Sequence, residues 1–405
     1  MRILLIYHFF YPDTVISARI FSDLAESLVA SGHDVTVYTS NRMIRSDRML
    51  SSVEDWNRIH ICRFRRPSFP QSNSIGRVLN SFFLQIEWLW SIFLHRKSFD
   101  TIIVGTDPQF VWGMFPWIRL INRHIRLIHW VFDLYPEAII ANSPCWMKCL
   151  AYLTKPFAKL SYLCCDHIVD IGSEMRKQLQ KYKHHAQCMT LTPWALKEPQ
   201  VMPSIDPEIR KQLFGEAKLG LLYSGTVGYA HDIMPFIELA RECRKRGIDA
   251  AFCFAGYGNC YQKQTSVISP EDTNIRLAGF ASEEELEKRL AAADINMVSL
   301  RTNWNGIVVP SKFFGSLAIG RPILFSGSEY NSLANYCLDY KIGFILSQNT
   351  VEELQKLITN RINLFQLKEN AFKVYNKFFS REIVCEKWNE LLNAIAGKDK
   401  NNNKI

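Results

Sequence analysis

A hydroxyl and an ammonium group stand side by side where a helix pattern begins in the C-terminal half of the sequence. Ser311 and Lys312 follow Pro310 at the end of the apolar run "VVP", and the apolar pattern "FFGSLAIG" comes after them. Unpaired backbone N–H groups and the helix dipole favour negative charge at the amino end of a helix. We therefore predict that Ser311 and Lys312 bind an anion. The alternative is that Lys312 is a solvated lysine at a helix end.

Glycine-containing loops follow two of the predicted strands in the same half. Gly225 and Gly228 lie in "YSGTVGYAHDI", and Gly256 and Gly258 lie in "FAGYGN". Loops of this kind let backbone N–H groups approach a diphosphate, although many of them are only turns between a strand and a helix. Neither loop has the spacing G-x-G-x-x-G, which argues against hydride chemistry with a dinucleotide.

The N-terminal half offers acidic and histidine candidates. Asp133 follows an apolar strand pattern in "HWVFDLYPEA", so we expect it at the carboxyl end of that strand, where a carboxylate can orient or deprotonate an acceptor hydroxyl. Glu137 and His8 are the other candidates for catalysis. Asp133 as a cap or turn residue and Glu137 as a first-turn glutamate are the alternatives. Asp107 suits an ordinary loop, and His129 suits the core.

The elements that must position these residues are strand patterns that alternate with helix patterns. Residues 196–218 are polar and contain prolines, and a second alternating series begins after them. Such patterns predict an α/β fold with two doubly wound, Rossmann-like domains. We place them at 1–197 and 198–380, and we expect 381–405 to form a C-terminal helix and polar tail that packs back toward the N-terminal domain. Ligands in such sheets bind outside the carboxyl ends of the strands.

Charge and apolar patterning point to a membrane surface. The formal net charge is +9, and residues 1–200 hold 23 Lys and Arg against 16 Asp and Glu, a surplus of seven. No nucleic-acid motif is present, so we expect no nucleic acid partner. The segment 78–94 is rich in aromatic residues and is flanked by arginines, and 145–165 mixes aromatic residues with lysines. An amphipathic helix lying in the membrane interface fits 78–94, with a buried domain helix as the alternative.

The expected arrangement of that helix is specific. Five large apolar residues should lie on one side, with Glu87 off that side: Phe82, Phe83, Ile86, Trp90 and Phe93. The segment is shorter and more polar than the ~20 apolar residues that a spanning helix needs.

The order of the motifs resembles that of the retaining family-4 glycosyltransferases, which have the GT-B fold of two Rossmann-like domains facing a central cleft. The C-terminal half matches in "YSGTVG", "FAGYGN", "IRLAGF", "AAADINMVSL" and "PSKFFGSLAIGRP", and the N-terminal half in "MRILLIYHFFYP", "FDLYPE" and "DHIVDIGSEMRKQL". The resemblance covers nearly the whole chain. It is greatest to the bacterial exopolysaccharide and O-antigen branch.

The resemblance implies a nucleotide-sugar donor, UDP- or GDP-linked, bound mainly by the C-terminal domain. It implies an acceptor against the N-terminal domain, with no cofactor and no metal. Catalytic roles would fall to Asp133, Glu137 and His8. Donor contacts would fall to Gly225, Thr226, Gly228, Gly256, Tyr257, Phe280, Ser311, Lys312 and Gly315.

This sequence departs from the family at several functional positions. Two glutamates spaced by seven residues are frequent in the family, and here their positions hold Ile307 and Gly315. An arginine and a lysine of the phosphate loop correspond to Thr226 and His231, and the histidine before the aspartate corresponds to Phe132. Lys312 is therefore our first candidate for the positive charge that a diphosphate needs.

Together these features predict a retaining glycosyltransferase that acts on a polyprenyl-diphosphate-linked glycan at the inner face of the cytoplasmic membrane, in surface polysaccharide biosynthesis. Three alternatives remain open. They are a soluble glycosyltransferase with a small-molecule acceptor, a sugar-nucleotide 2-epimerase of the same fold, and a catalytically silent subunit that binds nucleotide sugar.

Overall fold

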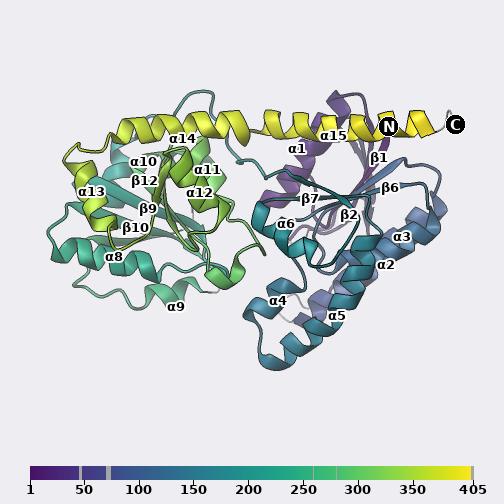
Figure 1. The fold of residues 1–405 in the computed structure, drawn as a ribbon, viewed down its shortest axis with the longest axis horizontal. Coiled ribbons are helices and arrows are strands. Elements are labelled where there is room, and N and C mark those ends of the chain that lie inside the picture. Colours follow the sequence, from purple (N-terminus) through teal and green to yellow (C-terminus); the bar gives the residue numbers. More distant parts are fainter. Residues whose placement is uncertain (45–47, 70–73, 259, 280, 403–405) are drawn as a thin grey trace. The chain divides into compact units, whose positions relative to one another are not determined.

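The chain folds into two compact units. The computed structural model describes residues 1–44, 48–69, 74–258, 260–279 and 281–402 (Figure 1). Unit 1 comprises Met1–Thr192 and Val384–Ile405, and unit 2 comprises Pro193–Ile383. The long helix α15 (Arg381–Asn402) contains the second boundary, so the last residues of the chain belong to unit 1.

Unit 1 is built on an eight-stranded sheet in the order β3-β4-β2-β1-β5-β6-β7-β8. All neighbouring strands are parallel except β3, which pairs antiparallel with β4. Ile3 to Ile6 of β1 are fully buried, as expected for a strand that is covered on both faces. The strands are β1 (Arg2–Ile6), β2 (Asp34–Ser40), β3 (Val53–Trp56), β4 (Ile59–Phe64), β5 (Thr101–Val104), β6 (Arg126–Trp130), β7 (His167–Asp170) and β8 (Gln187–Thr190).

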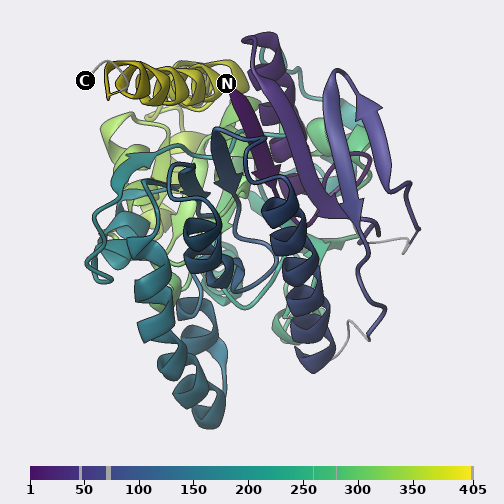
Figure 2. The same cartoon turned by 90° about the vertical axis from the view of Figure 1, so that its right-hand side faces the viewer.

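Helices connect these strands and cover the sheet. The 3-10 helix η1 and helix α3 follow each other directly, and α2 and α5 lie to either side of them (Figure 2). Helix α15 adds Trp388, which is fully buried with its ring centroid 5.0 Å from that of Trp130 in β6. The other helices of unit 1 are α1 (Ile16–Ala30), α2 (Ser74–Leu94), η1 (Val111–Met114), α3 (Phe115–Ile121), α4 (Glu137–Asn142), α5 (Cys145–Leu163) and α6 (Ser173–Gln180).

Unit 2 contains a six-stranded sheet, fully parallel, in the order β11-β10-β9-β12-β13-β14. Its core includes Leu221, Phe252 and Ile295 from three central strands, all fully buried. The strands are β9 (Leu219–Thr226), β10 (Ala250–Tyr257), β11 (Ile275–Ala278), β12 (Ile295–Ser299), β13 (Ile323–Ser326) and β14 (Gly343–Ile345).

The helices of unit 2 start where the sequence signals a start. Ser282 and Glu285 form a capping box at the beginning of α10, since each side chain accepts a hydrogen bond from the other residue's backbone N–H at 3.3 Å. The helices are α7 (Pro207–Phe214), α8 (Met234–Lys245), α9 (Tyr261–Thr265), α10 (Glu283–Ala292), η2 (Thr302–Trp304), α11 (Lys312–Ala318), α12 (Ser332–Asp339), α13 (Thr350–Ile358) and α14 (Leu364–Phe378).

Both sheets reverse their strand order once near the middle. In unit 1 the chain adds β2 and β4 on one side of β1, and then β5 to β8 on the other. In unit 2 it adds β10 and β11 on one side of β9, and then β12 to β14 on the other. Each unit is therefore doubly wound, as predicted. The reversal points lie between β1 and β5 and between β9 and β12, which are the places where such sheets bind ligands.

Candidate functional site

The predicted anion site of unit 2 lies at the reversal point between β9 and β12. Helix α11 begins at Lys312, and the Lys312 Nζ donates a hydrogen bond to the Thr226 carbonyl oxygen at 2.8 Å. The same ammonium lies 5.3 Å from the ring centroid of Tyr223 in β9. Because no described residue forms an ion pair with Lys312, its charge is available to a ligand. The structure thus brings Lys312 onto the Gly225 loop.

The glycines of this region fall into two groups. Gly225 has a φ of +118°, and a Cβ there would lie 3.0 Å from the Lys312 Cε. A Cβ on Gly256 would clash with the Gly225 carbonyl oxygen, and Gly258 has a φ of +122°. The backbone itself requires these three glycines. Gly228 and Gly315 face open space, where a Cβ would meet no described protein atom within 4 Å. Gly228 and Gly315 are therefore the glycines that leave room for a ligand.

His231 lies in the loop that follows Gly228 and could contribute positive charge there. His231 stands at the position where the family often has lysine, and its Nδ1 donates a hydrogen bond to the Ser299 carbonyl oxygen at 2.9 Å. Burial, and after it the charge of Lys312, lowers the pKa of His231 to about 3. His231 is therefore neutral at pH 7 and does not replace the missing lysine.

Arg301 is a second cation, which the sequence reasoning missed. It lies two residues after the end of β12, and its Nε donates to the His231 carbonyl oxygen at 3.1 Å, while its Nη2 lies 3.4 Å from Asp232 Oδ2. Lys312 and Arg301 thus bond to two carbonyls of the same loop, at Thr226 and His231. The available signal was its position immediately after an apolar strand, at the carboxyl edge.

The protein packed around Lys312 lowers the pKa of its ammonium, and burial is the cause. Its accessible surface, in contrast, shows a side chain that is only half-buried. Solvent that reaches the side chain screens part of its charge. A lysine whose charge is poorly solvated gains most from an anion beside it.

The remaining predicted donor residues have these positions. Ser311 occupies the N-cap position of α11 without a side-chain capping bond, and α11 has only 7 residues, so the dipole adds little there. Tyr257 is exposed at the end of β10, and Ile307 is buried. Phe280 lies outside the described residues. None of these positions assigns a role by itself, so the donor contacts stay a prediction.

The candidate residues of unit 1 gather at the reversal point between β1 and β5. His8 follows β1, and its Nδ1 lies 3.2 Å from Oδ1 of Asp107, which follows β5. His8 is buried, and its Nε2 has no hydrogen-bond partner among the described residues. The interpretation of Asp107 as an ordinary loop residue missed this pair, because it joins residues 99 positions apart.

Asp133 lies at the same edge, after β6. The Thr106 hydroxyl accepts hydrogen bonds from the backbone N–H groups of Phe132 at 2.7 Å and Asp133 at 3.5 Å, and so fixes the loop. Helix α4 begins at Glu137 with Pro136 at the N-cap, so Asp133 is not its cap. Desolvation by the surrounding protein raises the pKa of the Asp133 carboxyl group, and the negative charge of Asp107 raises it further. The Asp133 side chain is also exposed to solvent.

Glu137 is engaged elsewhere in unit 1. The Tyr182 hydroxyl donates to its Oε1 at 2.7 Å, and the Lys155 ammonium lies 3.3 Å from the same oxygen. These contacts of Glu137 connect α4 to α5 and to the segment after α6. Glu137 therefore has a structural role. His129 is a core residue, as predicted: it is buried beside the Val104 carbonyl oxygen at 2.9 Å, and burial lowers its pKa to about 4.

One side of α2 is apolar and exposed. Leu84, Trp88 and Ile92 are buried, and Glu87 is half-buried and accepts a hydrogen bond from the Arg65 backbone N–H at 2.9 Å. The predicted one-sided arrangement is confirmed, and a wholly buried helix is wrong. Among the described residues, no helix has both the length and the apolar character to cross a bilayer. The exposed residues of α2 are Val78, Phe82, Phe83, Ile86, Trp90, Phe93 and Leu94.

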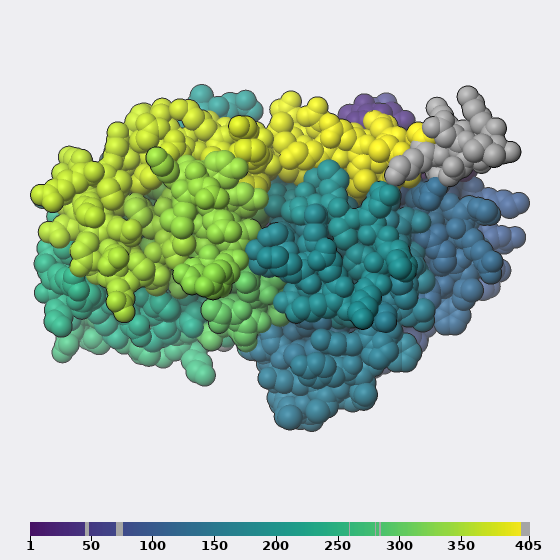
Figure 3. All heavy atoms as spheres, in the orientation of Figure 1, coloured from purple at the N-terminus to yellow at the C-terminus, as the bar shows by residue number. Residues whose placement is uncertain are grey.

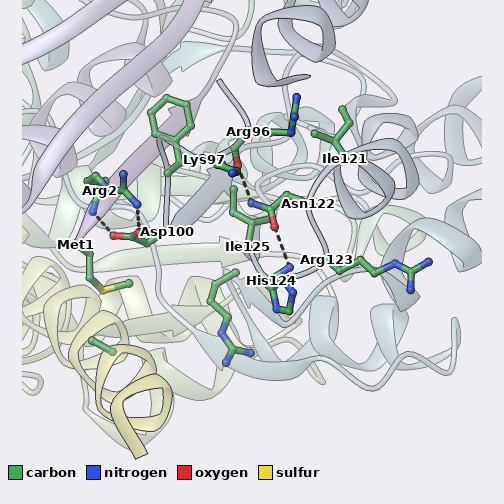
Figure 4. A pocket seen from close by; sticks show the side chains of 13 residues that line it. Met1, Arg2, Arg96, Lys97, Asp100, Ile121, Asn122, Arg123, His124 and Ile125 are labelled. Carbon is green, nitrogen blue, oxygen red and sulfur yellow. Dashed lines mark hydrogen bonds and ion pairs between the residues drawn. The ribbon is translucent and has the colours of Figure 1, made fainter. Parts of the chain in front are cut away.

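A separate pocket of about 860 Å³ lies at the opposite edge of the unit 1 sheet, by the amino ends of β1, β5 and β6. Figure 4 shows Arg2 bonded to Asp100, at 2.7 Å, and Asn122 tied to the backbone of Arg96 and His124. The Arg123 side chain points away from the other labelled groups in that view. Since ligands of doubly wound sheets bind at the carboxyl edge, this pocket is not part of the candidate site.

Comparison with known proteins gives a family for part of the chain. Residues 17–193 match the model of the family described as Glycosyltransferase Family 4. The chain is similar to a protein of Pseudomonas aeruginosa named "Probable glycosyltransferase WbjE", with 26% identity over 348 residues that cover 82% of this chain and 84% of that protein.

Solved structures are similar over almost the whole chain. Sucrose-phosphate synthase from Thermosynechococcus elongatus has a TM-score of 0.71 at 13% identity, with 98% of this chain and 100% of that chain covered. HepE from Anabaena in complex with UDP has a TM-score of 0.66 at 11% identity, with 97% and 100% covered. The chain therefore has the GT-B fold, and its residues 17–193 are similar to the Glycosyltransferase Family 4 domain.

Proposed function

We propose that this protein is a glycosyltransferase that moves a sugar from a nucleotide-sugar donor to a lipid-linked glycan, with retention of anomeric configuration. The observation that carries the proposal is the Lys312 ammonium, which lies on the Gly225–Thr226 turn at the reversal point of the unit 2 sheet without a carboxylate partner among the described residues. The GT-B fold and the family match over 17–193 support the same class of reaction.

In this proposal the donor diphosphate binds at Lys312. The open space beside Gly228 admits the diphosphate to the backbone N–H groups of the loop, and the ammonium neutralises its charge. HepE of Anabaena has a similar fold and was solved with UDP, which supports a uridine diphosphate sugar as donor, with a guanosine diphosphate sugar as the other candidate. The donor is a substrate, and the mechanism uses no cofactor and no metal.

Retention follows in this mechanism without a nucleophile from the enzyme. As the bond from the sugar to the diphosphate breaks, negative charge grows on the diphosphate, and Lys312 together with the loop stabilises it. The acceptor hydroxyl attacks from the side of the leaving diphosphate. Asp133 orients this hydroxyl and takes up its proton, and the raised pKa of Asp133 suits a base near neutral pH.

The lipid-linked acceptor is supported by the surface of unit 1. The exposed apolar side of α2 is accompanied by exposed Trp146, Leu153 and Phe157 on α5. Exposed apolar patches of this kind, contributed by two neighbouring helices, mark interaction sites. Arg96 and Lys97 follow α2 directly, and Lys148 and Lys159 lie on α5, so basic groups accompany the apolar ones. Apolar and basic groups together fit the anionic inner face of a cytoplasmic membrane, where a polyprenyl-diphosphate glycan for a surface polysaccharide is found.

A screen of nucleotide sugars tests this function. A ligand that binds only the folded protein raises its melting temperature, so the correct donor should raise that of the wild type and not that of Lys312→Ala. Transfer to a lipid-linked glycan should then be measured by release of the nucleoside diphosphate. If no uridine, guanosine or adenosine diphosphate or its sugars stabilises the protein, the proposal is wrong.

The same assays separate the other functions. A sugar-nucleotide 2-epimerase would interconvert its nucleotide sugar without any acceptor. A silent subunit would be stabilised by the nucleotide sugar but would release no nucleoside diphosphate. A soluble glycosyltransferase would transfer to small glycans as well as to lipid-linked ones. No observation on this chain favours these three functions over the first.

A further inference from the structure

An apolar groove of about 550 Å³ runs along unit 1 between α2 and α5. Phe82 and Ile86 from α2 and Phe157 from α5 line its walls, and Trp112 and Met114 from η1 line its floor. Figure 2 shows α2 and α5 projecting on either side of α3, and Figure 3 shows the α4–α5 segment projecting from the surface of unit 1. None of the lining residues is charged.

Three of the polar side chains of the groove, those of Ser81, Gln109 and Thr154, already have partners within the protein. Ser81 Oγ donates to the Arg77 carbonyl oxygen at 2.8 Å, and Thr154 Oγ1 donates to the Ala151 carbonyl oxygen at 2.7 Å. Gln109 Nε2 donates to the Tyr135 hydroxyl at 3.1 Å. A bound peptide or sugar would need hydrogen-bond partners for its own polar groups, and the groove offers few. A hydrocarbon chain needs none.

One end of the groove is formed by residues that lie close in the chain to the acidic edge of unit 1. Its floor begins at Gln109, two residues after Asp107, and Trp112 Nε1 donates to the Tyr135 carbonyl oxygen at 3.2 Å. Tyr135 is two residues after Asp133. Burial raises the pKa of Tyr135, the charges of Asp133 and Asp107 raise it further, and the charge of Arg77 opposes them. Arg77 of α2 directly precedes Val78, which lines the groove, so a cation lies beside this end of the groove.

We infer that the groove between α2 and α5 binds the hydrocarbon chain of a lipid phosphate. The phosphate end lies toward Arg77, and the chain leaves over the exposed rims of Phe82, Trp117 and Phe157, which are 57%, 59% and 66% exposed. This inference rests on the proposed function, because it makes the groove the place where the lipid of the acceptor enters from the membrane. The chain then positions the attached glycan at Asp133.

Binding of farnesyl phosphate to the intact protein tests the groove, with ethyl phosphate as the probe that lacks the chain. Binding is measured by tryptophan fluorescence below the concentration at which the lipid forms micelles. Ile86→Glu places a charge in the groove and should weaken farnesyl phosphate binding at least tenfold. Phe93→Glu is the matched control, since Phe93 is 44% exposed on the same helix against 45% for Ile86, but it does not line the groove. Its affinity should stay within twofold of wild type.

Several outcomes would overturn the inference. Equal affinity of wild type and Ile86→Glu would remove the groove as the binding place, and equal binding of ethyl phosphate would indicate an anion site without a chain. Binding to anionic liposomes without binding of farnesyl phosphate would leave a membrane surface only. Melting curves of both variants check folding, and we expect both to fold because Ile86 and Phe93 are exposed to a similar extent. If farnesyl phosphate binds in the groove but no nucleotide sugar stabilises the protein, the groove stands and the proposed function fails.

Discussion

The two sheets of this protein have the same winding, but the side chains at their reversal points carry opposite charges. In unit 2 the edge between β9 and β12 presents Lys312 and Arg301, which bond to two carbonyls of one loop. In unit 1 the edge between β1 and β5 presents Asp107 beside His8, with Asp133 close by. The same fold therefore positions both edges, and the side chains placed there set the chemistry.

In the proposed function, this difference assigns the donor to unit 2 and the acceptor to unit 1. A basic edge suits the diphosphate of a donor, whereas an acidic edge would repel it and suits the neutral hydroxyl of an acceptor. Because His231 is neutral at pH 7, the positive charge beside this loop of unit 2 lies on Lys312 and Arg301. Of these two, only Lys312 has no carboxylate partner among the described residues.

The largest effect is expected from the acidic edge. Asp133→Asn keeps the shape of the side chain and removes the base, so the turnover number should fall by about 10²–10⁴. Donor affinity, measured by calorimetry, should stay nearly that of wild type. Glu137→Gln is the control, because Glu137 bonds to Tyr182 and Lys155, and its change should lower the melting temperature more than the turnover number. Wild-type turnover in a folded Asp133→Asn protein would make Asp133 a turn residue only.

Substitutions at the basic edge of unit 2 should weaken binding of the nucleoside diphosphate. Lys312→Ala should weaken binding of the nucleoside diphosphate by about 1.5–3 kcal/mol, the range for hydrogen bonds to charged groups. Arg301→Ala should weaken this binding less, since the carboxylate of Asp232 already balances part of the charge of Arg301. Calorimetric titration of UDP and GDP into each variant measures both losses. An Arg301→Ala loss larger than that of Lys312→Ala would reverse the roles of the two cations.

The apolar side of α2 should bind membranes independently of both edges. Replacing Phe83, Trp90 and Phe93 by Ser should release the protein from anionic liposomes, because the apolar side chains no longer enter the interface. Each nearby Lys or Arg adds roughly 1 kcal/mol to binding at an anionic leaflet, so salt should weaken binding of the wild type. Sedimentation with liposomes measures this. Wild-type protein that ignores anionic liposomes would contradict the membrane surface.

The smallest effect is a pair of pH shifts in opposite directions. The raised pKa of Asp133 means that turnover should fall on acidification at a higher pH than for an ordinary aspartate. The lowered pKa of Lys312 means that donor affinity should fall on alkalinisation at a lower pH than for an ordinary lysine. Lys312→Arg should move the alkaline fall upward, since arginine stays charged. If donor affinity falls at the same alkaline pH in that variant, then deprotonation of Lys312 does not cause the loss of affinity.

Sequence patterns predicted the local features well, because they depend on neighbours along the chain. The buried strands, the capping box at Ser282 and the one-sided apolar helix α2 are all of this kind. The proximity of Lys312 to the Gly225 turn could also be predicted from the sequence, since parallel strands bring their carboxyl ends to one edge of the sheet.

Contacts between segments that are distant in the sequence could not be predicted from it. The pairing of His8 with Asp107 and of Glu137 with Tyr182 depends on which loops become neighbours, and no spacing in the chain encodes that. Gly256 looked like a phosphate-loop glycine, but its lack of a side chain is explained by the carbonyl of Gly225 on the neighbouring strand. Arg301 was missed because a lone arginine after a strand has many ordinary roles.

The central claim is that unit 2 holds the donor through Lys312 while unit 1 acts on the acceptor through Asp133. It is tested most directly by one calorimetric comparison of nucleoside diphosphate affinity in wild type, Lys312→Ala and Asp133→Asn. The account predicts a loss of roughly tenfold or more for Lys312→Ala and wild-type affinity for Asp133→Asn. Unchanged affinity in Lys312→Ala, or an equal loss in both variants, would contradict it.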